Sequence, residues 1–322
     1  GAFDIMTIGM YETPIWASNG WLVPLDDLSA EYDVNDILPA MREGLSHDGT
    51  LYAAPFYGES SMVMYRTDLV EATGMTMPEA PTWDDIAKLA RAMTDREKEI
   101  NGICLRGKAG WGEGGAFITV TANSFGARWF DENWKAQFDQ PEWANALNFF
   151  VDLMADAGPP GYATNGFNEN LSLFQQGKCG MWIDATVAAS FVTNPKDSTV
   201  ADKVGFALAP DTGLGKRSNW LWAWALAIPA GTQKAEAANN SSSGPPRKST
   251  SSWSPRMKVG PTCRRVPGPR STRTRSTRRC LSRRRRSSPS KPPTRRIRPS
   301  SRCHMSVSSL LPSRSSLVSP PR

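Results

Sequence analysis

Every acidic residue of this chain lies before position 239, and this boundary limits how much of the chain is able to fold. Residues 1–238 carry 31 Asp and Glu against 16 Lys and Arg, a formal charge of −15, whereas residues 239–322 carry 22 Lys and Arg and no acid, a formal charge of +22. The basic segment has one aromatic residue, Trp253, and no apolar periodicity. Because such a segment has too little apolar surface to bury a core, we expect its 84 residues to be disordered.

A shifted reading frame offers one explanation for the abrupt change at Asn239. Back-translating residues 257–263 and moving the frame back by one base permits Glu-Gly-Trp-Ala-Asn-Val, and the same shift on residues 303–310 permits Pro-Tyr-Val-Gly-Val-Gln-Phe. One constant shift that yields acidic and aromatic peptides favours a frameshift product. The alternative is a genuine basic tail that binds nucleic acid, since dense Arg favours phosphate contacts, although the tail lacks the interleaved aromatic residues that read bases.

Residues 1–238 lack the patterns of several enzyme classes. His47 is their only histidine, which leaves little for a His-based triad or a His-rich metal site, and we expect neither a metal nor a cofactor. No phosphate loop and no GxGxxG after a strand are present. No run of 18 apolar residues occurs, so we expect no membrane span. Cys104 and Cys179 permit one disulfide without requiring it.

Hydrophobic spacing predicts alternating helices and strands. Residues 3–8 and 220–228 are typical of strands, and Thr82 with Asp85 predicts a capping box at the start of a helix. Because helices and strands alternate along the chain, we expect an α/β architecture with mainly parallel strand pairing. The clearest helix spans residues 142–157, and its apolar face is predicted to contain Trp143, Leu147, Phe150, Val151 and Met154.

Aromatic residues near turns and strand ends are the first candidate ligand-binding residues. Eleven of the twelve tryptophans precede the basic segment. Sugars and sugar alcohols are recognised by flat rings that cover their C–H faces, together with polar groups that pair with their hydroxyls. The aromatic residues near turns or strand ends, each of which has the hydrophobic core as its alternative place, are Tyr11, Trp111, Trp182, Trp220 and Trp222, and all of these except Trp182 are predicted to bind the ligand.

Four charged residues complete the candidate site. Glu59 sits between two extended segments, where the chain is able to cross between two lobes, and its alternative role is a solvated turn residue. Arg106 and Asp184 each follow or end a strand and are expected to converge on one cleft, unless each forms an ordinary surface ion pair. Glu12 comes directly after the first strand.

Six segments carry a resemblance to a known family. Together they cover nearly all of residues 1–238 and resemble bacterial extracellular solute-binding proteins of the sugar class, of the mannitol/sorbitol type. The segments are FDIMTIGMYETPIW, LYAAPFYGESSMVMYRTDL, GICLRGKAGWGE, ARWFDENW, GPPGYATNGFNENLSLFQQGKCGMWIDATVAASFVT and WLWAWALAIP.

The resemblance implies a two-lobed α/β protein of the type II periplasmic-binding-protein fold. Residues 1–57 would belong to lobe one, residues 58–221 would form lobe two, residues 222–238 would return to lobe one, and residues 239–322 would be the basic tail. The fold would be incomplete at both ends: the opening strand–helix–strand unit and the signal peptide would be absent, as would the part that completes both lobes. We therefore expect an exposed sheet edge and poor ligand binding by this chain.

The same resemblance implies a function and its partners. The two lobes would close over a sugar alcohol or monosaccharide and deliver it to the permease subunits of an ABC importer. The intact family member would be periplasmic, and we expect a monomer that binds no nucleic acid. The competing hypothesis is a carbohydrate-active hydrolase, which needs two carboxylates across the cleft, and Glu12, Glu59 and Asp184 are the residues able to supply them.

Overall fold

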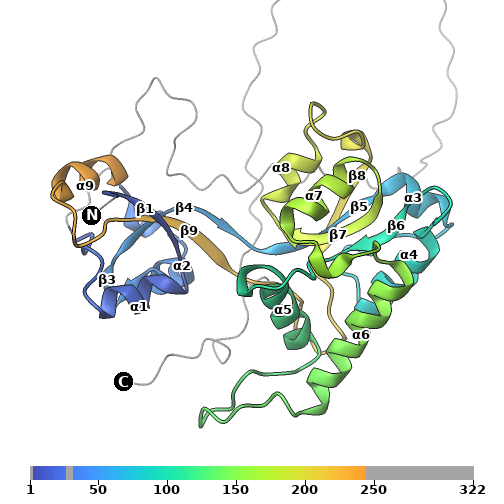
Figure 1. Cartoon of the computed structure of the whole chain (residues 1–322), viewed down its shortest axis with the longest axis horizontal. Helices are drawn as coiled ribbons and strands as arrows, with labels where there is room; N and C mark the ends of the chain where they lie inside the picture. The colour runs from blue at the N-terminus through green and yellow to red at the C-terminus, as the bar shows by residue number, and fades with distance from the viewer. Residues whose placement is uncertain (1–2, 27–31, 244–322) are drawn as a thin grey trace, which may run out of the picture.

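Two β-sheets form the centres of two lobes that meet at a hinge (Figure 1). The computed structural model describes residues 3–26 and 32–243. The first lobe consists of β1 (Met6–Gly9), α1 (Glu12–Ser18), η1 (Val34–Asp36), α2 (Pro39–Gly44), β2 (Ser46–His47), β3 (Thr50–Leu51), β4 (Ala53–Glu59), β9 (Trp222–Ala227) and α9 (Ala235–Ser243). The expected α/β architecture with two lobes is confirmed.

The second lobe contains the middle of the chain. Its helices cover both faces of one sheet, and the short helix η2 has π geometry. Its elements are β5 (Ser61–Arg66), α3 (Thr67–Ala72), α4 (Trp83–Met93), β6 (Asn101–Cys104), η2 (Trp111–Gly115), α5 (Ala116–Ser124), α6 (Pro141–Ala157), η3 (Tyr162–Thr164), α7 (Phe167–Gln175), β7 (Cys179–Ala185), α8 (Ala188–Val192), η4 (Ala201–Lys203) and β8 (Val204–Leu208).

Strand pairing is mostly antiparallel, so the expectation of mainly parallel sheets is wrong. The first lobe's sheet has the order β1-β9-β4 with both pairs antiparallel, and the second has the order β6-β7-β5-β8, in which only β6 and β7 run parallel. In the second lobe, β5 enters the sheet from the first lobe and runs against both β7 and β8. In the first lobe, β9 returns from the second lobe and runs against both β1 and β4. The alternation of helices and strands along the sequence does not show in which direction each strand enters its sheet. Among the described residues β1 has a strand neighbour on one side only.

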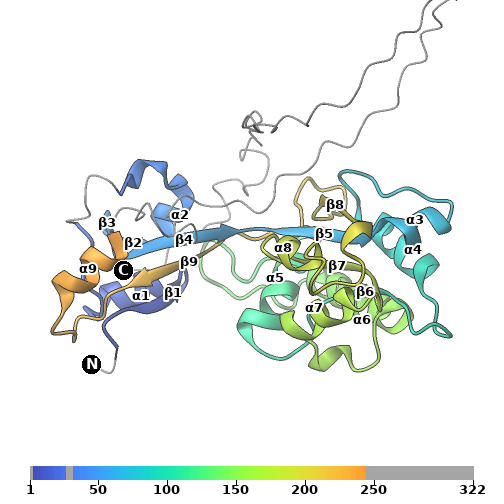
Figure 2. The same cartoon turned by 90° about the horizontal axis from the view of Figure 1, so that it is seen from above.

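The hinge consists of two chain crossings that lie side by side. Figure 2 shows β4 continuing into β5 from one lobe to the other. Gly58 and Glu59 still pair with β9, so this crossing lies at Ser60 and not after Tyr57, where the sequence placed the lobe boundary. The hydroxyl of Ser61 donates to the carbonyl of Ser218 at 2.9 Å, which ties the first crossing to the segment that leads back into β9.

The helix α4 begins as predicted. The side chain of Thr82 accepts a hydrogen bond from the backbone N–H of Asp85 at 3.1 Å, and the backbone N–H of Thr82 donates to the Asp85 carboxylate at 2.9 Å. The capping box is therefore confirmed, because each residue satisfies a backbone N–H that the first helical turn leaves free.

The buried face of α6 differs from the prediction at two positions. Leu147 is 42% exposed and Val151 is 50% exposed, although both were expected in the core. The helix presents a narrower face to α4, α5 and β6 than its apolar residues suggested. Its buried residues are Trp143, Ala146, Phe150, Leu153, Met154 and Ala157.

Two further features resolve questions that the sequence left open. Cys104 at the end of β6 and Cys179 at the start of β7 form a disulfide, with 6.1 Å between their Cα atoms. The helix α9 continues through Asn239 to Ser243, so the expectation of disorder from Asn239 onward is wrong for these first positions. A helix that has begun in the acidic segment extends at little cost, because nucleation is the expensive step. The rest of the predicted tail lies outside the described residues.

Candidate functional site

Three aromatic rings from two lobes meet at the hinge. Tyr11 follows β1, Trp222 begins β9, and Trp111 begins η2 in the second lobe. The ring centroid of Trp111 lies 5.5 Å from that of Tyr11 and 5.6 Å from that of Trp222. Tyr11 is 63% exposed and Trp111 is 59% exposed, so the two lobes present accessible ring surface to each other here. We refer to Tyr11, Trp111 and Trp222 as the interlobe aromatic cluster.

The position of Trp222 depends on a glycine in the neighbouring strand. A Cβ atom at Gly9 would lie 2.0 Å from Cζ2 of Trp222, so the indole occupies space that only glycine leaves free. Trp224 packs edge-on against the same indole, with 5.6 Å between ring centroids. The indole Nε1 of Trp222 is buried and has no hydrogen-bond partner among the residues that the structure describes. The ring is therefore held in place by packing while its one polar atom remains unused.

Arg106 and Asp184 form a buried ion pair beside this cluster. Nε of Arg106 donates to Oδ2 of Asp184 at 2.8 Å, and Nη2 donates to Oδ1 at 2.5 Å. Asp184 also accepts hydrogen bonds from the indole N–H of Trp182 at 3.0 Å and from its neighbour Ala185 at 2.7 Å. Asp184 is fully buried, and the side chain of Arg106 is 11% exposed, so the alternative of a surface ion pair is wrong.

Arg106 connects the ion pair to the segment that carries Trp111. Its Nη1 donates to the carbonyl of Gly112 at 2.8 Å and lies 3.4 Å from a carboxylate oxygen of Glu113. Its guanidinium stacks on Phe167 and on Trp220, at 5.3 Å and 5.8 Å from their ring centroids. Since protein acceptors occupy all three of its nitrogens, Arg106 orients η2 and its tryptophan rather than offering a free cation.

Glu59 is the unpaired carboxylate of the site. It is the last residue of β4 and lies opposite Trp222 in the antiparallel register, so the two side chains share one face of the sheet. Burial raises the pKa of Glu59 to about 7; the positive charge of Arg106 lowers it, and the negative charge of Asp184 raises it further. Within residues 3–26 and 32–243 it has neither a hydrogen bond nor an ion pair, and as a half-buried residue of β4 it is not part of a turn.

Glu12 stands apart from the other seven predicted residues. It is the first residue of α1, where a carboxylate is favoured by the helix dipole. Its Oε2 is buried and has no hydrogen-bond partner within the described part of the chain. Tyr11, Trp111 and Trp222 are joined by ring contacts, Asp184 and Trp220 contact Arg106, and Glu59 lies opposite Trp222.

Two residues of the site were missed by sequence reasoning. Glu113 accepts a hydrogen bond from the backbone N–H of Phe167 at 3.0 Å and faces Arg106, while Phe167 supplies the second ring on which Arg106 stacks. A Cβ at Gly166 would lie 2.6 Å from Glu113 Oε2, so a glycine makes room for the carboxylate. The dense glycines of residues 107–115 are the sequence signal for this arrangement, because they let the backbone fold back on itself.

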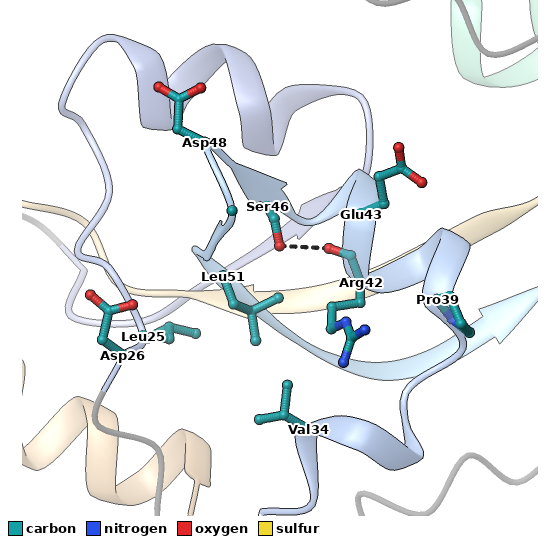
Figure 3. A pocket seen from close by; sticks show the side chains of 10 residues that line it. Leu25, Asp26, Val34, Pro39, Arg42, Glu43, Ser46, Asp48 and Leu51 are labelled. Atoms are coloured by element: carbon teal, nitrogen blue, oxygen red, sulfur yellow. Dashed lines mark hydrogen bonds between the residues drawn. The ribbon is translucent and has the colours of Figure 1, made fainter.

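A separate hollow of about 710 Å³ opens on the first lobe, and Figure 3 shows the side chains around it. Its walls combine acidic residues with one arginine, and Arg42 is held by a hydrogen bond to Asn35 at 3.1 Å. None of the eight predicted site residues lines it. The lining residues are Leu25, Asp26, Val34, Pro39, Arg42, Glu43, Ser46, Asp48, Gly49 and Leu51.

The part of the chain that the structure describes contains neither a metal-binding cluster nor a membrane-spanning helix. No group of three or more His, Cys, Asp or Glu there is arranged to hold a metal ion. No helix there is long and apolar enough to span a bilayer.

Comparison with known proteins gives a consistent result. The family model described as bacterial extracellular solute-binding protein matches residues 1–239. The chain is 52% identical over 238 residues to a mannitol-binding protein of Pseudomonas aeruginosa, and the match covers 74% of this chain and 55% of that protein. It therefore spans little more than half the length of this curated relative.

Solved structures give the same picture. The crystal structure of an ABC transporter solute-binding protein from Agrobacterium vitis S4, with bound D-mannitol, matches with a TM-score of 0.73 and 68% identity over 76% of this chain and 59% of that one. A solute-binding protein from Agrobacterium radiobacter K84 in complex with ribitol matches with a TM-score of 0.67 and 27% identity, over 73% of this chain and 60% of that one.

Proposed function

This chain belongs to the bacterial extracellular solute-binding protein family, and on that premise we propose that its two lobes bind an acyclic sugar alcohol of the mannitol type between them, with the poor affinity that the sequence leads us to expect of this chain. The single observation that carries the proposal is the contact of Trp111 in the second lobe with Tyr11 and Trp222 in the first. Exposed rings from both lobes at one hinge are suited to a ligand that bridges the lobes.

The chemistry of the site fits a polyol. An extended alditol has a C–H face that packs on aromatic rings and a row of hydroxyls that both donate and accept hydrogen bonds. Glu59, with no partner of its own among the described residues, is suited to accept from a ligand hydroxyl, and the unpaired Nε1 of Trp222 is suited to donate. The D-mannitol bound to the Agrobacterium vitis protein supports mannitol as the first ligand to test.

The proposed mechanism is a shift between open and closed arrangements of the lobes. A ligand that contacts Trp111 on one side and Tyr11 and Trp222 on the other binds the closed arrangement more tightly and therefore increases its population. The two hinge crossings at Ser60 and Leu221 are the positions where the backbone would change between the two states.

The partners follow from the family and form part of the proposal. A closed, ligand-loaded binding protein would be recognised by the permease subunits of an ABC importer. We propose that the whole protein acts in the periplasm as a monomer, in which residues 1–59 and 222–238 belong to lobe one and residues 61–221 to lobe two, with the first crossing at Ser60.

A hydrolase has less support. Catalysis would need carboxylates on both sides of the ligand that are free to exchange protons. Both oxygens of Asp184 are engaged by Arg106, Trp182 and Ala185, so this residue is not free for acid–base chemistry. We therefore propose that the chain binds its ligand without changing it, and incubation with the polyol followed by chromatography checks for turnover.

Isothermal titration calorimetry with D-mannitol, D-sorbitol and ribitol tests the proposal. Trp111→Ala should weaken binding by about 30-fold, because it removes the ring that links the lobes, which corresponds to about 2 kcal/mol. Since Trp111 is 59% exposed, the variant should lose less than about 1 kcal/mol of unfolding free energy.

Trp129→Ala is the matched control. Trp129 is 41% exposed and packs on Phe138 and Trp143 in the segment between α5 and α6, where none of the eight predicted residues lies. Its replacement should leave polyol affinity unchanged. Absence of detectable polyol binding by the folded wild-type chain would contradict the proposal, as would equal effects of the two substitutions.

A further inference from the structure

The charged groups around the hinge are unbalanced in favour of carboxylates. Glu59, Glu113 and Asp184 face a single guanidinium, that of Arg106. Arg106 directs Nε and Nη2 to Asp184 and Nη1 to Gly112 and Glu113, so each of its three nitrogens already has a protein acceptor. A ligand at this place would meet a net negative field with one carboxylate, that of Glu59, not yet paired.

The interlobe aromatic cluster begins next to the same carboxylate, at Trp222. Glu59 and Trp222 are directly opposite on neighbouring strands, and Trp111 and Tyr11 extend the ring surface from Trp222 across to the second lobe. Rings of this kind attract cations through their negative faces, and cages of two or three rings with a carboxylate are a recurrent way to recognise an ammonium group. The unpaired Glu59 and the three rings are thus two independent features that suit a cation.

We propose that the interlobe site also binds alditols that carry an ammonium group, in preference to the parent alditol and against alditol-derived acids. The polyol chain would lie on the rings, and the ammonium group would pair with the Glu59 carboxylate beside Trp222. This inference rests on the proposed function, because it concerns the same site and adds a ligand class to it.

Isothermal titration calorimetry at pH 8 with a matched series tests the inference. The series is D-mannitol, 1-amino-1-deoxy-D-mannitol and D-mannonate, which share one stereochemistry and differ in charge. The amine should bind about tenfold more tightly than mannitol, since a charge-assisted pair and a cation–π contact are added, and mannonate should bind about tenfold more weakly. Added salt should reduce the affinity for the amine but not for mannitol.

Two variants assign the effect to its residues. Glu59→Gln keeps the shape and a hydrogen-bonding group but removes the charge, so the ratio of the amine's affinity to that of mannitol, both measured on the variant, should fall to about one. Trp111→Leu should reduce that advantage by removing one ring of the cage. Circular dichroism of both variants checks that they fold.

The outcomes separate the inference from the proposed function. If mannitol binds and the amine binds no more tightly, or if Glu59→Gln preserves the amine's advantage, the inference is overturned while polyol binding stands. If neither ligand binds the folded wild-type chain, the proposed function and the inference fail together.

Discussion

Arg106 and Asp184 are joined by two parallel hydrogen bonds, Nε to Oδ2 at 2.8 Å and Nη2 to Oδ1 at 2.5 Å, with the carboxylate fully buried. The pair links the end of β6 to β7 and, through Gly112, holds the segment that carries Trp111. A bidentate pair of this kind fixes both position and angle, so it orients the aromatic site that we propose to bind polyols.

Arg106→Ala should lower the free energy of unfolding by about 3–5 kcal/mol, because it leaves Asp184 charged, buried and unpaired. Urea denaturation followed by circular dichroism measures the loss. The matched control is Arg91→Ala, which breaks the Arg91–Asp156 pair, whose side chains are 48% and 53% exposed. That exposed pair should contribute less than about 1 kcal/mol. Equal losses in the two variants would show that burial of the Arg106 pair has no energetic consequence.

Gly9→Ala should displace the indole of Trp222, because the new Cβ would lie 2.0 Å from Cζ2 of the ring. We expect a loss of about 1–3 kcal/mol in unfolding free energy together with weaker polyol binding. The double variant Gly9→Ala with Trp222→Ala should lose less stability than the sum of its single changes, since the clash is gone. Gly231→Ala is the control, because a Cβ there meets nothing within 4 Å.

The stability of the chain should depend on pH through Glu59. Burial raises its pKa from an ordinary value of 4.5 to about 7, so between these values the folded chain binds more protons than the unfolded chain. The free energy of unfolding should therefore fall as the pH rises through this window, by at most about 3 kcal/mol. The charged groups that change the pKa of Glu59 are Arg106, in the loop after β6, and Asp184, in β7.

Glu59→Gln removes this titration and should flatten the corresponding part of the pH profile, so the variant should be more stable than the wild type at pH 8. Urea denaturation at pH 5 and pH 8 measures the difference. Carboxyl NMR gives a second readout, in which one glutamate resonance should titrate near pH 7 and be missing from the variant. Parallel pH profiles for the two proteins would refute the role of Glu59.

The disulfide between Cys104 and Cys179 should stabilise the second lobe. It closes a segment with a sequence separation of 75, and a loop of that length restricts the unfolded chain by about 2–4 kcal/mol. Cys104→Ala with Cys179→Ala should lower the urea midpoint accordingly. Mass spectrometry of unreduced peptides checks the bond itself, and two separate thiol peptides from the oxidised protein would rule it out.

The sequence alone was enough for features that depend on local chemistry. Thr82 and Asp85 satisfy each other's backbone N–H groups three residues apart, so the start of α4 was predictable from adjacent letters. The α/β class and the two lobes were also predictable, because motif similarity extends over residues 1–239.

Sequence spacing was less reliable wherever packing decided the outcome. Leu147 and Val151 have the same periodicity as Phe150 but remain exposed, because a helix buries only the face that its neighbours cover. The sequence predicts disorder from Asn239 onward, but residues 239–243 form the end of α9, because a helix propagates from its own preceding turn.

By itself, the sequence determined the chemical groups of the candidate site: aromatic residues and carboxylates at strand ends, with a single arginine among them. Tertiary structure decided which of these groups are used and which stay free. Arg106 and Asp184 neutralise each other because two strands from distant parts of the chain bring them together, whereas Glu59 stays unpaired beside Trp222 because β4 and β9 align in one register. Contacts between residues far apart in sequence depend on strand register and lobe packing, and neither is encoded in the spacing of neighbouring residues.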